Sequence, residues 1–120
     1  MKQYPLSSPH RMKRSSDFKK VYANGRVYRG RYFIMYVLDV GEKNSKPSLK
    51  IGFTVSKKVG IAPVRNRVKR LLREIFRLTL PDLKTGVDIV IVARSASAGI
   101  SYADARESVL ELFGRSGLMG

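Results

Sequence analysis

The chain lacks cysteine and tryptophan altogether, and its one histidine is His10. The absence of cysteine excludes disulfides, thiolate metal ligands and cysteine nucleophiles. No stretch approaches the roughly 18 consecutive apolar residues that a membrane-spanning helix needs, and the N-terminal segment has no apolar run typical of a signal peptide. We therefore expect a cytoplasmic protein with no membrane partner, in which His10 is solvated and has no function.

Acidic residues are also scarce, since nine Asp and Glu stand against 24 Lys and Arg and the formal net charge is +15. The nine carboxylates are scattered, and their spacing predicts neither an acid pair for general acid–base catalysis nor a metal cluster. We therefore expect no catalytic residue, metal or cofactor in the protein itself. Because so positive a field costs self-repulsion unless a polyanion screens it, nucleic acid is the first candidate partner and an anionic membrane surface a distant second.

The chain is long enough for one domain, with 120 residues of which 43% are hydrophobic. We expect that domain to span residues 15–114. The polar segment 1–14 contains Pro5 and Pro9 and is expected to be a disordered tail, the alternative being a basic arm that orders on RNA. Residues 115–120 are expected to fray.

Hydrophobic periodicity and turn residues predict three helices and four strands. In chain order these are a helix over 17–24 capped by Ser15 or Ser16, strands over 26–28, 32–40 and 49–56, a helix that starts at Pro63 and includes Leu78, a strand over 87–94, and a helix from Ser101 to Phe113 that stops at Gly114. The run 41–48 is predicted to be a loop. A strand, helix, strand order implies a crossover and at least one parallel pair.

The strand over 49–56 alternates apolar side chains with a second face that is small and polar. That face includes Gly52 and Thr54, and it leaves room for a ligand to lie on the sheet. On the first helix, Phe18, Val21 and Tyr22 share one side, and we interpret Val21 as a core residue.

The segment Lys57–Arg77 has the densest chemical signal, with eight Lys or Arg and one acid, Glu74. At 100° per residue its apolar side chains fall within an arc of roughly 120°, and they are Val64, Val68, Leu71, Leu72, Ile75 and Leu78. The opposite side carries Asn66, Lys69, Arg70, Arg73 and Arg77. Arginine binds phosphate oxygens bidentately, whereas a merely solubilising surface would mix charges of both signs, so this face favours nucleic-acid binding. The loop before it, residues 56–60, leads into a helix N-terminus, which is a natural anion site.

The run GFTVSKKVGIAPVRNRVKRLLREIF, residues 52–76, resembles the signature of the bacterial ribonuclease P protein subunit. The family pattern is a strand ending in SKK-V/I-G, a short linker and then RNR-x-KR-hh-RE, where h is apolar. RSSDFKKVYANG at 14–25, RYFIMYVLD at 31–39 and VDIVIVAR at 87–94 resemble its first helix, second strand and last strand. The linker departs from the pattern, because Ile61 replaces an asparagine and Pro63 is added.

The resemblance implies a fold that the spacing does not. Members of this family are single-domain α+β sandwiches of order αβββαβα with a four-stranded mixed sheet. The crossover through the helix with the RNR motif is left-handed, against the usual rule.

The resemblance also implies the function. One protein pairs with one large catalytic RNA, and the complex is an endoribonuclease that removes the 5′ leader from precursor tRNA. The RNA and the Mg²⁺ that it holds would perform the hydrolysis, and no DNA is involved. A structural nucleic-acid-binding protein of ribosomal or nucleoid type is the main alternative, followed by a protein nuclease that acts alone and a membrane-active helix.

Site residues follow from the resemblance by position. Those expected to bind the catalytic RNA are Lys57, Lys58, Arg65, Asn66, Arg67, Lys69, Arg70 and Arg73. Those expected to bind the single-stranded leader are Phe18, Tyr22 and Tyr36. Aromatic rings beside cations are typical of platforms for unpaired bases, although Phe18 has the alternative of a core position.

Overall fold

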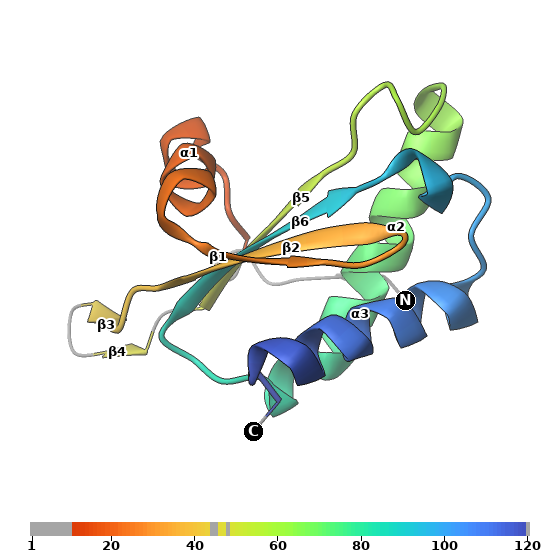
Figure 1. The fold of residues 1–120 in the computed structure, drawn as a ribbon. Coiled ribbons are helices and arrows are strands. Elements are labelled where there is room, and N and C mark those ends of the chain that lie inside the picture. The colour runs from red at the N-terminus through yellow and green to blue at the C-terminus, as the bar shows by residue number, and fades with distance from the viewer. Residues whose placement is uncertain (1–10, 44–45, 48, 120) are drawn as a thin grey trace, which may run out of the picture.

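A four-stranded mixed sheet forms the middle layer of the protein, with one helix on one face and two on the other (Figure 1). This computed structural model describes residues 11–43, 46–47 and 49–119. Its main elements are α1 (Ser15–Asn24), β1 (Arg26–Arg29), β2 (Phe33–Asp39), β5 (Leu49–Thr54), α2 (Ala62–Thr79), β6 (Val87–Ala93) and α3 (Tyr102–Ser116). A short hairpin of β3 (Glu42–Lys43) and β4 (Lys46–Pro47) lies where a loop was expected, and 3-10 turns η2 (Leu80–Asp82) and η3 (Ser95–Ser97) flank β6. No helix within the described ranges is both long and apolar enough to cross a membrane.

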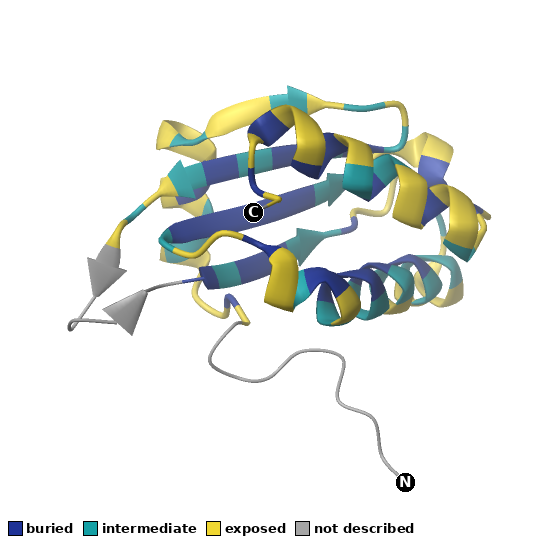
Figure 2. Cartoon of the chain, turned by 90° about the horizontal axis from the view of Figure 1, so that it is seen from below, coloured by how far each residue is buried: buried dark blue, intermediate teal, exposed yellow. Residues whose placement is uncertain are grey.

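The strands lie in the order β1-β2-β6-β5, and only β5 and β6 are parallel. The connection between these two parallel strands runs through α2. Figure 2 views the sheet from the side covered by α2 and α3, and there β5 and β6 both point to the right with β6 above β5. A right-handed crossover would place the second strand below the first. The crossover is therefore left-handed, and the predicted α+β sandwich of order αβββαβα is confirmed, with the hairpin as an addition.

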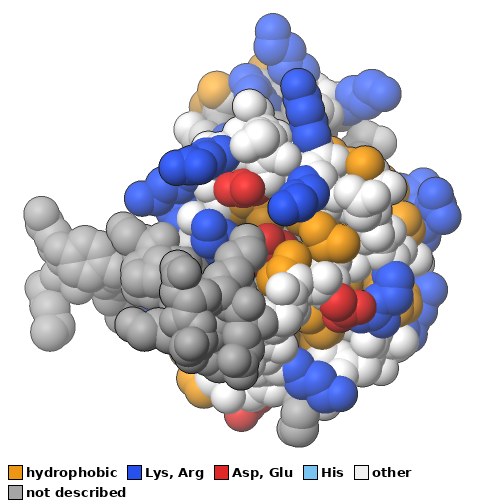
Figure 3. Space-filling model, turned by 90° about the vertical axis from the view of Figure 1, so that its left-hand side faces the viewer, with side chains coloured by type: hydrophobic (Ala, Val, Ile, Leu, Met, Phe, Trp, Pro, Cys, Tyr) orange, Lys and Arg blue, Asp and Glu red, His pale blue; other side chains and the backbone are white. Residues whose placement is uncertain are grey.

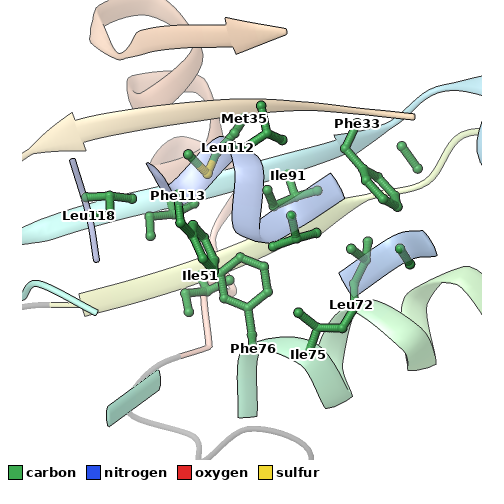
Figure 4. Close-up of a cluster of buried hydrophobic side chains, with 14 of the residues drawn as sticks. Phe33, Met35, Ile51, Leu72, Ile75, Phe76, Ile91, Leu112, Phe113 and Leu118 are labelled. Carbon is green, nitrogen blue, oxygen red and sulfur yellow. The ribbon is translucent and has the colours of Figure 1, made fainter. Parts of the chain in front are cut away.

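The main core lies between the sheet and the pair α2 and α3. Phe76 of α2 stands at its centre, with ring centroids 5.4 Å from Phe53 of β5 and 5.1 Å from Phe113 of α3, both edge to face. Figure 4 shows Phe76 and Phe113 pointing toward each other near Ile51. The apolar arc predicted for α2 was wrong at its end, because Leu78 is 51% exposed while Phe76 is fully buried. Phe76 is buried because it packs against rings of β5 and α3. The periodicity of α2 alone does not contain this information.

The chain is ordered further at its N-terminal side than predicted. Met12 is buried and its N–H donates to the carbonyl of Ile51 at 2.9 Å, while Arg11 pairs with Ile51 in a parallel bridge. The expected tail is therefore wrong for residues 11–14. The first ten residues, which include His10, lie outside the described part of the chain.

The predicted starts of α1 and α2 shift slightly. Arg14 is the N-cap of α1, so Ser15 and Ser16 lie inside its first turn, and Pro63 is the second residue of α2 rather than the first. Proline still fits there, since the N–H groups of a first turn have no partner within the helix.

The last helix passes through Gly114 to Ser116 and ends at Gly117, whose φ of 75° is left-handed. Leu118 beyond it is only 2% exposed and accepts a hydrogen bond from the N–H of Lys84 at 2.8 Å. The predicted stop at Gly114 was therefore wrong, and residues 115–118 belong to the helix end and its cap rather than to a frayed tail. Gly117 ends the helix because glycine adopts a left-handed conformation without a Cβ penalty.

Candidate nucleic-acid interface

Lys69, Arg70 and Arg73 of α2 form a row of cations, and carboxylates near α2 are few. Glu74, the one acid of the helix, forms a close ion pair with Arg77. The other ion pairs in the described ranges involve Arg26 and Arg115. The row formed by Lys69, Arg70 and Arg73 is therefore left without an ion pair in the residues that the structure describes, which suits a surface that binds an anion.

The loop that leads into α2 is fixed by its own hydrogen bonds. The N–H groups of Lys58 and Val59 donate to the Oγ and carbonyl oxygen of Ser56, at 3.3 and 3.1 Å. Nε of Arg65 reaches back from the helix to the carbonyl of Gly60 at 3.1 Å. Ile61 is the N-cap and provides no side-chain cap, and Pro63 has no N–H, so the first-turn N–H groups that an anion could meet are those of Ala62 and Val64.

A crevice opens where α2 meets the outer edge of β5 and the N-terminal segment. Cations and apolar groups line it together: Arg11, Met12, Phe18, Ile51, Gly52, Phe53, Lys69 and Arg73. Burial of the Arg73 guanidinium, and next to it the positive charge of Arg11, lower the pKa of Arg73 from its ordinary value. Arginine stays charged at neutral pH, so the crevice holds like charges that an anion would relieve.

The ring of Phe18 lies directly on β5. A Cβ at Gly52 would be only 2.5 Å from Cζ of Phe18, so the missing side chain of Gly52 lets the ring approach the strand. Phe18 is partly buried and packs with Met12, Val21 and Val90, which confirms Val21 as a core residue. Phe18 therefore belongs both to this small second core and to the wall of the crevice.

Tyr22 and Tyr36 meet on the same side of the sheet as Phe18. Their ring centroids are 4.9 Å apart with an interplanar angle of 83°, and the Tyr22 hydroxyl is hydrogen-bonded to Oγ1 of Thr54 at 2.7 Å. Tyr22 is exposed, so part of its ring is open to a ligand. The three predicted aromatic residues are thus brought together by α1, β2 and β5.

The surface around these rings is strongly positive. Figure 3 views the face where α1 lies in the upper part, and Lys and Arg side chains clearly outnumber Asp and Glu there. The exposed cations of α1 and of the residues just before it include Lys13, Arg14, Lys19 and Lys20. A polyanion that approaches the rings therefore meets attraction from α1 as well as from α2.

Comparison with known proteins gives a consistent result. The family model described as "Ribonuclease P" matches residues 6–117. The "Ribonuclease P protein component" of Bacillus cereus strain B4264 is 36% identical over 113 residues, which cover 94% of this chain and 96% of that protein. The Bacillus anthracis protein of the same name is also 36% identical, covering 94% and 92%.

The chain belongs to the ribonuclease P protein family. Solved structures of the family have the same fold, since the ribonuclease P protein of Staphylococcus aureus matches with a TM-score of 0.81 at 26% identity, covering 96% of this chain and 95% of that one. The protein from Thermotoga maritima matches with a TM-score of 0.74 at 29% identity, covering 88% and 96%.

In the structure, the cations expected to bind the catalytic RNA fall into two groups. Lys69 and Arg73 line the crevice, whereas Lys57 and Arg65 line a separate hollow at the start of α2 together with Gly60, Ile61 and Ala62. Among the remaining expected residues, Lys58, Asn66 and Arg70 are exposed and Arg67 is partly buried. The sequence predicted one cationic surface, whereas the structure has two neighbouring ones.

Some residues of the crevice were not among the site residues expected from the family resemblance. Arg11 was considered only as part of a basic arm, and Phe53 only as an inward-facing strand residue. The small polar face of β5 was the available signal, since it predicted room for a ligand beside Gly52 and Thr54. In the structure, Phe18 and Tyr22 of α1 occupy the space beside Gly52 and Thr54. The space that remains is the crevice, which opens toward α2.

Proposed function

We propose that this protein is the protein subunit of a ribonuclease P ribonucleoprotein. It binds one catalytic RNA and the single-stranded 5′ leader of precursor tRNA, and it assists the endonucleolytic removal of that leader in the cytoplasm. Membership of the family supports this assignment. The observation that carries it is the crevice, which is lined by cations of α2 and the N-terminal segment together with the rings of Phe18 and Phe53.

The chemistry of the crevice matches an unpaired nucleic-acid strand. Guanidinium and ammonium groups bind phosphates irrespective of sequence, and each base stacked on an aromatic side chain contributes about 1–3 kcal/mol. Phe18 provides such a ring in the crevice with Lys69 and Arg73. The paired rings of Tyr22 and Tyr36 lie on the same face of the sheet as Phe18. A leader has unpaired bases and phosphates together, so it would engage both walls.

The outer cations of α2 are assigned to the catalytic RNA. Arg70 and Asn66 are exposed and do not line the crevice, and Lys57, Lys58 and Arg65 surround the helix start with its open N–H groups. Contacts of this kind bind the phosphate backbone and set the position of the protein rather than read a sequence.

In this proposal the hydrolysis is performed by the RNA with the Mg²⁺ that it holds. The side chains gathered at the crevice are cations and aromatic rings, which bind and orient a strand. Their contribution is to favour precursor over mature tRNA, because only the precursor has the strand that fills the crevice.

The proposal is tested with the reconstituted complex and two substitutions at one position. Tyr22→Ala removes the ring and should weaken precursor binding by about 1–3 kcal/mol while leaving mature tRNA binding unchanged. Tyr22→Phe keeps the ring and removes the hydroxyl bonded to Thr54, so it should keep most of the precursor affinity. Equal losses on precursor and mature tRNA with Tyr22→Ala would contradict the role of the aromatic rings in leader binding.

A second assay separates the proposal from a structural nucleic-acid-binding protein. The wild-type protein should increase cleavage of precursor tRNA by a folded catalytic RNA at low Mg²⁺ concentration, and a merely structural protein should not. Cleavage by the protein without any RNA subunit would instead assign the chemistry to the protein.

A further inference from the structure

A second group of arginines surrounds the turn between β1 and β2, and the family resemblance assigned no role to it. Its members come from four places in the chain: Arg29 at the end of β1, Arg31 in the turn, Arg94 after β6 and Arg115 in the last turn of α3. All four are exposed. We refer to these four residues as the arginine turn.

The arginine turn is held together by hydrogen bonds to its backbone. Nη1 of Arg94 donates to the carbonyl of Gly30 at 3.0 Å, and Nη1 of Arg115 donates to the carbonyl of Arg29 at 2.8 Å. The N–H of Arg94 also donates to the carbonyl of Tyr32 at 2.8 Å. Two guanidinium groups that are distant in sequence are thus fixed on consecutive carbonyls, which reduces the conformational freedom that binding would otherwise remove.

The side chain of Arg31 is also positioned. Its guanidinium carbon lies 5.2 Å from the ring centroid of Tyr32, a cation–π distance. Tyr32 in turn packs against the main core. Arg31 is therefore held by a ring that is itself anchored in the core.

The positive charge of this group is poorly balanced. Among the residues that the structure describes, the ion pair that reaches it joins Arg115 to Glu111 at 3.9 Å, and both side chains are largely in solvent. Exposed pairs of this kind contribute little. A guanidinium has five N–H donors, so one bond to a carbonyl leaves donors that can face phosphate oxygens.

The arginine turn is separate from the crevice. The crevice lies at the β5 edge of the sheet and the turn at the β1 edge, at the two ends of the order β1-β2-β6-β5. Two to three strand spacings of about 4.8 Å separate β5 from the strands β2 and β1 that the turn joins, so a single phosphate cannot contact both sites.

We propose that the arginine turn is a second RNA-binding surface, which binds the phosphodiester backbone of the catalytic RNA at a segment other than the one on α2. Arginine forks pre-positioned on backbone carbonyls suit a lasting partner of high charge density. Helices α2 and α3 cover the same face of the sheet, so the outer cations of α2 and Arg115 on α3 can contact one large RNA (Figure 1). The inference extends the proposed function and rests on its RNA partner.

The test measures the affinity of the protein for the catalytic RNA at several salt concentrations. Arg31→Gln should reduce the magnitude of the slope of log K against log salt by about 0.7–0.9, and the double variant Arg29→Gln/Arg31→Gln by about twice that. Arg94 and Arg115 are left intact because they hold the backbone. The matched control is Arg106→Gln, an exposed residue on the opposite side of α3 from Arg115, which should leave the slope unchanged.

Arg31→Lys separates charge from folding, because it keeps the cation and should restore the wild-type slope. An unchanged slope in the double variant would overturn the inference, as would an equal change in Arg106→Gln or a loss that Arg31→Lys does not restore. A change seen only when precursor tRNA binds the assembled complex would assign the surface to the substrate and also overturn it. If the wild-type protein did not bind the catalytic RNA, the proposed function itself would fail.

Discussion

Phe18 lies so close to Gly52 that a Cβ at position 52 would sit 2.5 Å from the tip of the ring. This contact joins α1 to β5 and forms one wall of the crevice. A glycine in the interior of a strand usually weakens it, so its presence here is explained by the approach of the ring. The contact between Phe18 and Gly52 therefore fixes part of the crevice lining.

We predict that Gly52→Ala pushes Phe18 off the strand and lowers the free energy of unfolding by about 1–3 kcal/mol. Denaturant unfolding followed by circular dichroism measures this change. In a Phe18→Leu background the smaller side chain leaves room for the new methyl group, so the cost of Gly52→Ala should shrink. Equal costs in the two backgrounds would mean that the ring does not limit the space at position 52.

The two glycines at the end of α3 should respond in opposite ways. Gly114 lies inside the helix, and apart from its chain neighbours and the helix's own backbone no atom lies within 4 Å of the point that a Cβ would occupy, so Gly114→Ala should stabilise the protein by about 0.5–1 kcal/mol. Gly117 has a φ of 75°, so Gly117→Ala should destabilise it by about 1–2 kcal/mol. Thermal unfolding of both variants measures the difference, and a stabilising Gly117→Ala would contradict the helix end described above.

Two apolar residues near the end of α2, one buried and one exposed, should also differ in their effect on stability. Phe76→Ala should cost about 3–5 kcal/mol because the ring is fully buried between Phe53 and Phe113. Leu78→Ala should change stability by less than about 0.5 kcal/mol because its side chain is half exposed. Chemical denaturation of the two variants under the same conditions provides the comparison, and similar losses at both positions would contradict the assigned core.

These residues also show what the sequence alone could predict. The period of α2 predicted a buried and a basic face, because that pattern depends only on neighbours along the helix. The burial of Phe76 and the exposure of Leu78 depend on where β5 and α3 lie, which no local period contains. For the same reason the sequence indicated a free polar face on β5 but not the ring of Phe18 on Gly52. The left-handed crossover came from the family resemblance, since general rules favour the opposite hand.

The N-terminal contact was the least predictable part of the site. Segment 1–14 has the composition of a disordered tail, yet Met12 is buried and hydrogen-bonded to Ile51. A single apolar residue in a polar stretch gives no periodic signal. Its position becomes clear only when the open edge of β5, which accepts the bridge, is known.

Arg11 and Arg73 lead to the last prediction, a trade-off between stability and binding. Burial and, after it, the charge of Arg11 lower the pKa of Arg73, and the second cause means that the two cations repel each other in the free protein. Arg11→Gln should therefore raise the free energy of unfolding slightly at low salt, and the gain should fade as added salt screens the repulsion. The same substitution should weaken precursor binding and reduce the magnitude of its salt slope by about 0.7, because one cation facing the single strand is lost.

The matched control for this trade-off is Lys13→Gln, which removes one exposed charge two residues away and is not among the residues that line the crevice. Lys13→Gln should change the salt dependence of unfolding and the salt slope of precursor binding less than Arg11→Gln does. Urea unfolding at low and high salt, combined with precursor binding over the same salt range, measures both sides. If Arg11→Gln lowered stability at low salt, Arg11 would hold the N-terminal segment in place rather than strain it, and the crevice would be a structural contact instead of a site prepared for an anion.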